Sequence, residues 1–229
     1  MILSKLRALF TLLQFTITVS IVIICMYLFR SKNYIFRHYW AKMQLKLMGV
    51  KLEIKGELDP NADMLMMNHQ SILDIVLLEA LCNRNLAWVA KKEIKNIPWF
   101  GRILSAPKMI IVERENKTSL VKLLRDAKDR IEAKRPIAIF PEGTRSDGKQ
   151  LKRFKVGAKM IAEKNSLKVQ PIIIIGTRDI FDSQNFTQKP GVVKIIYFHS
   201  VQADKKTNWY KDCEELMRET LQKELSSDI

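Results

Sequence analysis

The stretch "MLMMNHQSILDIV", residues 64 to 76, sets a polar interruption between two apolar runs. The run "MLMMNH" (64–69) is short and apolar, which predicts a buried strand, and "SILDIVLLEALC" (71–82) predicts a buried helix. The strand is expected to end at His69, and Ser71 is placed to cap the following helix. The sequence therefore predicts a strand–turn–helix unit with His69 in the turn.

The alternation of strand-like and helix-like runs continues toward the carboxyl terminus. Further strands are expected at 51–56, 86–91, 108–114, 136–140, 169–176 and 192–198, and further helices at 118–135, 156–165 and 207–225. Such alternation is typical of layered α/β proteins. We therefore predict an α/β fold with a mixed, mostly buried β-sheet flanked by helices.

The amino-terminal region has a different character. Residues Ala8 to Phe29 contain no charged side chain over 22 positions, which is long enough to cross a hydrocarbon core of about 30 Å. A secretory signal usually has a shorter apolar core and a small-residue cleavage site, which "MYLFRSKNY" lacks. Residues 33–49 mix aromatic and basic side chains, as in a helix at a membrane surface, although packing against the globular domain explains them equally well. We expect residues 1–49 to form a membrane-associated helical pair that spans the bilayer or dips into one leaflet, and residues 50–229 to form the globular domain.

The net charge indicates the kind of partner, and the cysteine content indicates the redox state of the thiols. The formal net charge is +15, from 39 Lys and Arg against 24 Asp and Glu, which favours anionic partners. Because an apolar segment is also present, we expect anionic membrane lipids and no nucleic acid. Cys25, Cys82 and Cys213 are odd in number and lie outside any C-x-x-C spacing, which predicts reduced thiols. No metal site and no cofactor is expected.

His69 and Asp74 form the first candidate constellation. Asp74 falls in the first turns of the predicted helix, close enough to fold back toward the imidazole. A carboxylate that accepts a hydrogen bond from one ring nitrogen leaves the other nitrogen free to act as a base. The alternative is a purely structural pair, because a short His-x-x-x-x-Asp match has many false positives.

A second constellation is "FPEGTRS" (140–146), directly after a predicted buried strand. Glu142 and Arg145 are not expected to be buried, so a loop at the edge of the sheet presents them to solvent or a ligand. Lys91 and Arg114 lie on other loops, and cations from several loops can converge on one phosphate. Residues 143–150, "GTRSDGKQ", nearly match a nucleotide-binding P-loop, but Gln150 replaces the hydroxyl residue that holds Mg²⁺, which disfavours nucleotide hydrolysis.

Together these motifs resemble a known family. "NHQSILD", "PWFG…IIVER", "FPEGTRS" followed by "FKVGA", and "VQPIIIIG" appear in the order of the four motif blocks of the PlsC-like glycerolipid acyltransferases, over about residues 50 to 200. The resemblance implies that His69 is a general base oriented by Asp74. It also implies that the acceptor's phosphate is bound by Lys91 (or Lys92), Arg114, Glu142, Gly143, Thr144 and Arg145.

The resemblance implies an activity as well. Residues 50–229 would transfer an acyl group from acyl-CoA or acyl carrier protein to the sn-2 hydroxyl of lysophosphatidic acid, giving phosphatidic acid, at the cytoplasmic face of the membrane. Pro107-Lys108 and Glu113 depart from the usual pattern and leave glycerol-3-phosphate or another lysolipid as alternative acceptors. A non-catalytic protein that binds anionic lipid is a further alternative. Backbone N–H groups at the start of the helix after His69 are expected to stabilise the oxyanion.

Overall fold

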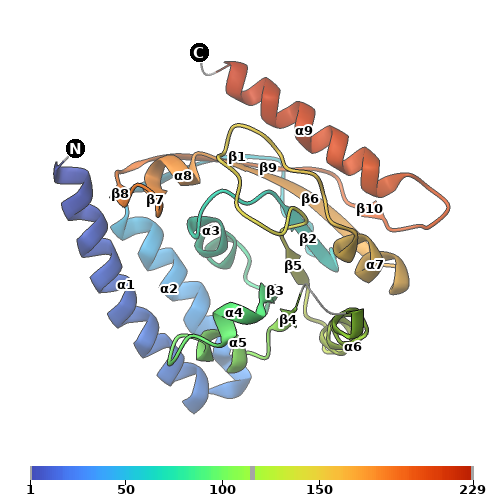
Figure 1. Ribbon diagram of the computed structural model, residues 1–229, viewed down its shortest axis with the longest axis horizontal. Helices are drawn as coiled ribbons and strands as arrows, with labels where there is room; N and C mark the ends of the chain where they lie inside the picture. The colour runs from blue at the N-terminus through green and yellow to red at the C-terminus, as the bar shows by residue number, and fades with distance from the viewer. Residues whose placement is uncertain (1, 114–116, 228–229) are drawn as a thin grey trace.

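A mixed sheet forms the middle layer of the structure (Figure 1), which is a computed structural model that describes residues 2–113 and 117–227. Within these residues the strand order is β1-β9-β6-β2-β5-β3-β4, and β10 pairs with β6. The strands of this sheet are β1 (Val50–Lys55), β2 (Met64–Met67), β3 (Ala87–Lys91), β4 (Ile110–Val112), β5 (Ile137–Ile139), β6 (Lys168–Ile175), β9 (Gly191–Tyr197) and β10 (Val201–Gln202). The short strands β7 (Phe181–Asp182) and β8 (Thr187–Gln188) pair separately.

Five neighbouring strands, β4, β3, β5, β2 and β6, run parallel, whereas β9 is antiparallel to β6. In the register, Met66 of β2 lies opposite Ile139 of β5, and Met67 lies opposite Ile172 of β6. The carboxyl ends of parallel strands meet at one edge of a sheet, which is where ligands bind in open α/β folds. The segments that follow β2, β5 and β6 are therefore neighbours.

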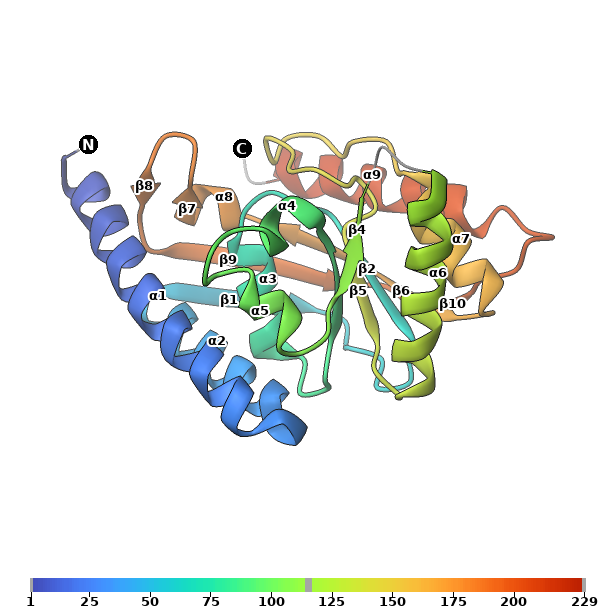
Figure 2. The same cartoon turned by 60° about the horizontal axis from the view of Figure 1, so that its bottom comes forward.

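Helices cover both faces of the sheet (Figures 1 and 2). One face packs against α6 (Lys117–Glu132), α7 (Val156–Lys164) and α9 (Trp209–Ser227), and the other against α2 (Asn33–Leu47), α3 (Leu73–Leu81) and α5 (Arg102–Ser105). The remaining helices are α1 (Ile2–Leu28), η1 (Arg30–Lys32), α4 (Lys92–Lys95) and α8 (Thr177–Ile180). Alternate residues of β2 enter opposite cores, Met64 and Met66 in one and Leu65 and Met67 in the other, because strand side chains alternate between faces.

The predicted α/β class is confirmed, with one local correction at the decisive stretch. The strand β2 ends at Met67, two residues before the expected end at His69. The side chain of Asn68 explains the early end, since its amide donates to Ile174 O at 2.8 Å and its Oδ1 accepts from Ile174 N at 2.8 Å. These two bonds take the place of backbone pairing, so the chain turns away from the sheet before His69.

The helix α1 is 27 residues long and apolar enough to cross a membrane, by length and composition. It pairs with α2 through a polar seam, in which Gln14 and Gln44 exchange side-chain hydrogen bonds and Trp40 Nε1 donates to Thr18 Oγ1 at 3.0 Å. Many of its large apolar side chains are exposed, among them Leu9, Leu13, Ile17, Ile21 and Ile24. The outer surface of α1 is therefore apolar, although its inner surface packs on the protein.

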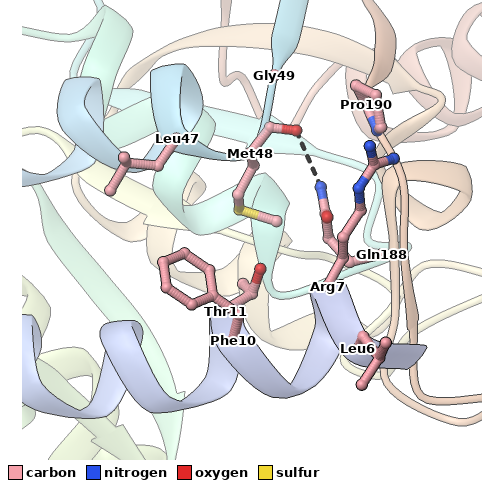
Figure 3. Close-up of a pocket in the computed structure, with 9 residues that line it drawn as sticks. All are labelled: Leu6, Arg7, Phe10, Thr11, Leu47, Met48, Gly49, Gln188 and Pro190. Carbon is pink, nitrogen blue, oxygen red and sulfur yellow. Dashed lines mark hydrogen bonds between the residues drawn. The ribbon is translucent and has the colours of Figure 1, made fainter. Parts of the chain in front are cut away.

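The amino-terminal half of α1 borders a pocket of about 440 Å³ (Figure 3). Leu6, Arg7 and Phe10 of α1 line one side, and the turn between α2 and β1 lines the other. Gln188 of β8 also lines the pocket and donates from Nε2 to Met48 O at 2.9 Å. The contact between α1 and the domain thus continues to this end of the helix.

The second helix, α2, is part of the protein core. Arg37 is 4% exposed, and its Nη1 lies 2.5 Å from Glu79 Oε1 on α3. The same carboxylate oxygen accepts a hydrogen bond from Trp88 Nε1 at 2.7 Å. Burial raises the pKa of Glu79, and the charge of Arg37 lowers it again in part. A cut at residue 49, the expected boundary between the helical pair and the globular domain, would remove Arg37 and leave Glu79 buried without its cation.

This ion pair generates a stability prediction. Arg37→Ala should lower the free energy of unfolding by about 3–5 kcal/mol, because breaking a buried pair leaves an uncompensated charge. Chemical denaturation in detergent would measure the change. The exposed Lys42 on the same helix supplies the control, since Lys42→Ala should stay within about 0.5 kcal/mol. Equal stability of the two variants would contradict this role for Arg37.

Candidate active site

His69 and Asp74 lie in direct contact at the carboxyl end of β2. His69 Nδ1 is 2.8 Å from Asp74 Oδ2, and the His69 side chain is 13% exposed whereas Asp74 is fully buried. His69 Nε2 makes no hydrogen bond to the described part of the chain. A neutral imidazole that donates its Nδ1–H to a carboxylate keeps Nε2 as a proton acceptor. The geometry therefore suits a general base.

The carboxylate of Asp74 is fixed from all sides. Its Oδ2 accepts the backbone N–H groups of Gln70 at 2.7 Å and Ser71 at 2.9 Å, in addition to the imidazole. Its Oδ1 accepts the hydroxyl of Thr177 at 2.5 Å, from the first residue of α8. A carboxylate with this many donors has one orientation, so the ring that it holds has one orientation too.

The amides at this turn differ from the sequence-based expectation in two ways. Backbone N–H groups at the start of the helix after His69 are the expected oxyanion donors, but those of Gln70 and Ser71, just before α3, donate to Asp74. The expected helix cap is also wrong, since Ile72 is the N-cap residue of α3. The Ser71 hydroxyl donates instead to Phe181 O at 2.8 Å. Its contact with Leu73 N is long, at 3.4 Å.

The "FPEGTRS" loop holds the backbone of His69 on both sides. Glu142 Oε1 accepts the N–H of His69 at 2.8 Å, and Ser146 N donates to His69 O at 2.7 Å. Glu142 Oε2 also accepts the N–H of Lys152 at 2.8 Å. The two loops that follow β2 and β5 are therefore joined at the candidate base.

The expectation that Glu142 is not buried is wrong. Its residue exposure is 1%, because both carboxylate oxygens accept backbone N–H groups and are satisfied without water. Burial raises the pKa of Glu142 to about 7, and the hydrogen bonds from Lys152 N and His69 N counteract part of that rise. The loop thus turns the side chain of Glu142 inward and leaves Thr144 and Arg145 exposed.

An aromatic stack supports the face of the imidazole. The rings of His69 and Phe140 lie with centroids 3.8 Å apart and planes inclined by 11°. Trp88 stacks behind Phe140, with centroids 5.4 Å apart. Stacked rings restrict rotation about the side-chain bonds of His69, so the ring is held by its edge through Asp74 and by its face through Phe140.

The other predicted ligand residues of this loop surround the turn. Gly143 has φ +69°, a conformation that favours glycine, and its N–H donates to Phe140 O at 2.9 Å. Thr144 and Arg145 are exposed, and Arg145 Nη1 lies 3.4 Å from Ser183 Oγ. A polar pocket of about 430 Å³ lies beside the loop, and its lining includes the cations Arg145, Lys152 and Arg178.

The predicted residues of the second motif block lie on the neighbouring strands. Lys91 is the last residue of β3, is partly buried, and is opposite Val112 of β4 in the register. Lys92, the alternative to Lys91, is exposed, and its Nζ pairs with Glu113 Oε1 at 2.7 Å. Arg114 lies outside the described residues. The structure therefore brings His69, Asp74 and Glu142 into one cluster. Lys91 lies at the end of β3, which is separated from β2 by β5.

Sequence reasoning missed two residues that touch the cluster. Thr177 follows "IIIIG", and a hydroxyl residue just after a buried parallel strand was the available signal, because that strand ends at the same edge as β2. Phe140 is the first residue after β5, and no sequence pattern indicates its contact with the imidazole. Neither residue is polar and exposed, which is the usual mark of a site residue.

Comparison with known proteins places this geometry in a family. The family model for acyltransferases matches residues 52–175. The chain is 37% identical over 218 residues to the 1-acyl-sn-glycerol-3-phosphate acyltransferase of Helicobacter pylori strain J99, covering 94% of this chain and 92% of that protein. It is 30% identical over 167 residues to the lyso-ornithine lipid O-acyltransferase of Rhizobium meliloti, covering 69% of this chain and 56% of that protein.

The fold has a counterpart among solved structures. The crystal structure of the 1-acyl-sn-glycerophosphate acyltransferase PlsC from Thermotoga maritima matches with a TM-score of 0.80 and 23% identity, covering 98% of this chain and 97% of that one. The match confirms the mixed sheet flanked by helices. Since the family model spans more than half of the chain and the Helicobacter pylori relative matches nearly all of it, this chain belongs to the acyltransferase family and is an acyltransferase enzyme.

Proposed function

We propose that the enzyme transfers an acyl group from a thioester of coenzyme A or acyl carrier protein to the sn-2 hydroxyl of 1-acyl-glycerol-3-phosphate, producing phosphatidic acid. The observation that carries the proposal is the His69–Asp74 pair, with Nδ1 held at 2.8 Å and Nε2 left as an acceptor. The name of the Helicobacter pylori relative supports the choice of acceptor.

The proposed reaction is a direct acyl transfer. His69 Nε2 accepts the proton of the acceptor hydroxyl while its oxygen attacks the thioester carbonyl. The new C–O bond forms, the C–S bond breaks, and the leaving thiolate takes the proton from the imidazolium. Asp74 stabilises that imidazolium. A thioester is already activated, so no acyl-enzyme is needed, and the Ser71 hydroxyl is directed toward Phe181.

Glu142 has a positioning role in this proposal. The family resemblance implied a direct contact with the acceptor, but both of its carboxylate oxygens already accept backbone N–H groups. By accepting the N–H of His69, Glu142 fixes the position of the His69 backbone at the end of β2. It therefore acts on the reaction through His69.

Phosphate binding is assigned to the cations around the "FPEGTRS" loop. Arg145 is exposed at the border of the polar pocket and can present two N–H groups to a phosphate. Lys91 and Arg114 belong to the same proposal as the cations of the second motif block. Gly143 and Thr144 form the turn that positions Arg145.

A specific observation favours a second candidate acceptor. The Rhizobium meliloti relative is named for a lyso-ornithine lipid and is 30% identical. An acceptor panel of lysophosphatidic acid, glycerol-3-phosphate and lyso-ornithine lipid, read by release of free thiol from an acyl thioester, distinguishes the candidates. The proposal expects the highest kcat/KM with lysophosphatidic acid.

The proposed location is the cytoplasmic leaflet of the membrane. Contacts between α1 and the globular domain run from the pocket at Arg7 to the hydrogen bond between Trp99 Nε1 and Ser20 Oγ, at 2.9 Å. A helix held along its side by the domain cannot cross the bilayer unless the domain enters with it. We therefore favour insertion of α1 into one leaflet, aided by anionic lipids that attract nearby Lys and Arg by about 1 kcal/mol each.

Kinetics of two variants test the base. His69→Ala should lower kcat by about 10²- to 10⁴-fold, the usual contribution of a general base. Asp74→Asn should cost less, because an amide can still hold the ring but does not stabilise the imidazolium. Ser71→Ala should retain most of the activity. A loss in Ser71→Ala as large as in His69→Ala would contradict direct transfer.

Substrate dependence tests Arg145. Arg145→Ala should raise the acceptor KM by about 10- to 100-fold, since hydrogen bonds to charged groups contribute about 1.5–3 kcal/mol. The donor KM should change little. Arg145→Lys should restore only part of the effect, because an ammonium lacks the two-pronged geometry. Equal increases in the donor KM and the acceptor KM would show that Arg145 is not a specific ligand of the acceptor phosphate.

A third pair of variants tests Glu142. Glu142→Gln turns one acceptor into an N–H donor that faces a backbone N–H, so stability should fall by about 1–3 kcal/mol. Because the base is then displaced, kcat should fall while the acceptor KM stays the same. Glu53→Gln, in an exposed position on β1 far from the loop in sequence, is the control. A raised acceptor KM in Glu142→Gln would indicate direct substrate contact instead.

A further inference from the structure

The chain between β3 and β4 exposes apolar side chains on a short helical segment. This α4–α5 segment (residues 92–106) leaves Ile94 41% exposed, Ile97 48% exposed and Trp99 40% exposed. Scattered apolar residues are normal on a protein surface, but clustered ones mark contact sites. None of these three side chains takes part in the proposed chemistry.

The segment is built to hold these side chains outward. Trp99 has φ +63°, in the left-handed region that non-glycine residues rarely adopt. A Cβ on Gly101 would lie 1.9 Å from Lys95 O, so only glycine fits that turn. Gly101 N closes the turn by donating to Ile97 O at 2.8 Å. Backbone strain of this kind persists where the surrounding structure enforces it.

The segment adjoins the apolar surface of α1 (Figure 2). Trp99 Nε1 donates to Ser20 Oγ at 2.9 Å. Ile17 and Ile24, both exposed, lie one turn to either side of Ser20 on the same face of α1. Behind them, Ile103 packs with the buried cluster of Val22, Ile23 and Met26. The exposed apolar surfaces of α1 and of the segment are thus continuous.

Cations accompany the apolar side chains. Lys95 and Arg102 are exposed, as is Lys92, which pairs with Glu113. The guanidinium of Arg102 lies 5.3 Å from the centroid of the Trp99 ring. Alternating basic, aromatic and aliphatic side chains are typical of segments that lie at the boundary between headgroups and acyl chains. Their charge is complementary to an anionic lipid surface.

We propose that the α4–α5 segment is a second membrane-contact site, which inserts Ile94, Ile97 and Trp99 into an anionic bilayer beside α1. The inference rests on the proposed function, since Lys91, a proposed phosphate ligand, directly precedes the segment. An acceptor lipid would then reach Lys91 from the bilayer without crossing water. An acidic carrier protein would match the cations, but it would have to cover the apolar face of α1 as well, whereas a bilayer covers both.

The test places an environment-sensitive fluorophore at Ile97→Cys in a full-length Cys25→Ser protein, in which Cys82 and Cys213 are buried. Vesicles of phosphatidylcholine and phosphatidylglycerol are added. The emission should rise and shift to the blue, and lipids with spin labels on their acyl chains should quench it. A Lys205→Cys control, in the exposed β10–α9 loop at the far end of the molecule (Figures 1 and 2), should show neither change.

A second probe at Leu13→Cys on α1 separates the possible failures. If the probe at position 13 enters the bilayer and the probe at position 97 stays in water, the proposal is overturned while membrane anchoring by α1 stands. A shift at position 97 with acyl carrier protein but not with vesicles overturns it in favour of protein docking. Transfer to lysophosphatidic acid, measured on the same proteins, reports separately whether the proposed function holds.

Kinetics supply a test that does not depend on labelling. Two KM values are compared, one for an acceptor embedded in vesicles and one for a short-chain, water-soluble acceptor. In the Ile94→Asp/Ile97→Asp double variant, the ratio of the first KM to the second should be about tenfold higher than in the unsubstituted protein. Lys205→Asp, which adds a negative charge at the far end, should leave the ratio unchanged. An unchanged ratio in the double variant would overturn the proposal.

Discussion

The hydrogen bonds that hold the backbone of His69 are the constraint on which the site depends. Its N–H donates to Glu142 and its carbonyl accepts from Ser146, so the loops after β2 and β5 share one residue. The parallel register of Met66 with Ile139 makes this possible, because both loops leave the sheet at the same level. With the backbone held in this way, Asp74 and Phe140 fix the orientation of the imidazole. In the proposed reaction this fixed imidazole is the general base.

Three buried carboxylates connect this site to the rest of the molecule. Asp74, Glu142 and Glu79 are all buried, and burying a charge is costly unless hydrogen bonds or ion pairs compensate. Each carboxylate is compensated by partners from other elements, which ties those elements together. Glu79 binds Trp88 and Arg37, so contacts run without a break from α2 through the Trp88–Phe140 stack to His69. The helices α1 and α2 and the sheet edge that carries His69 are parts of one packed unit.

Periodicity predicted the sheet and helices because burial in this fold follows the alternation of strands and helices. The five-residue spacing across a strand–helix turn also made contact between His69 and Asp74 possible, and the structure shows that contact. The burial of Glu142 could not be predicted in this way, because its partners are backbone amides of His69 and Lys152 that no side-chain pattern reveals. The contact of Thr177 with Asp74 depends on β6 lying beside β2, which is a property of strand order. The sequence around Arg37 is typical of a basic helix at a membrane surface, and only the structure shows that Arg37 is buried against Glu79.

The central claim is that His69 activates the acceptor for direct transfer, without an acyl-enzyme. The most direct test mixes the enzyme rapidly with one equivalent of acyl thioester and measures the release of free thiol over a single turnover. We expect no thiol before lysophosphatidic acid is added, and one equivalent of thiol per phosphatidic acid formed afterwards. A burst of thiol in the absence of acceptor would show a covalent intermediate and contradict the account.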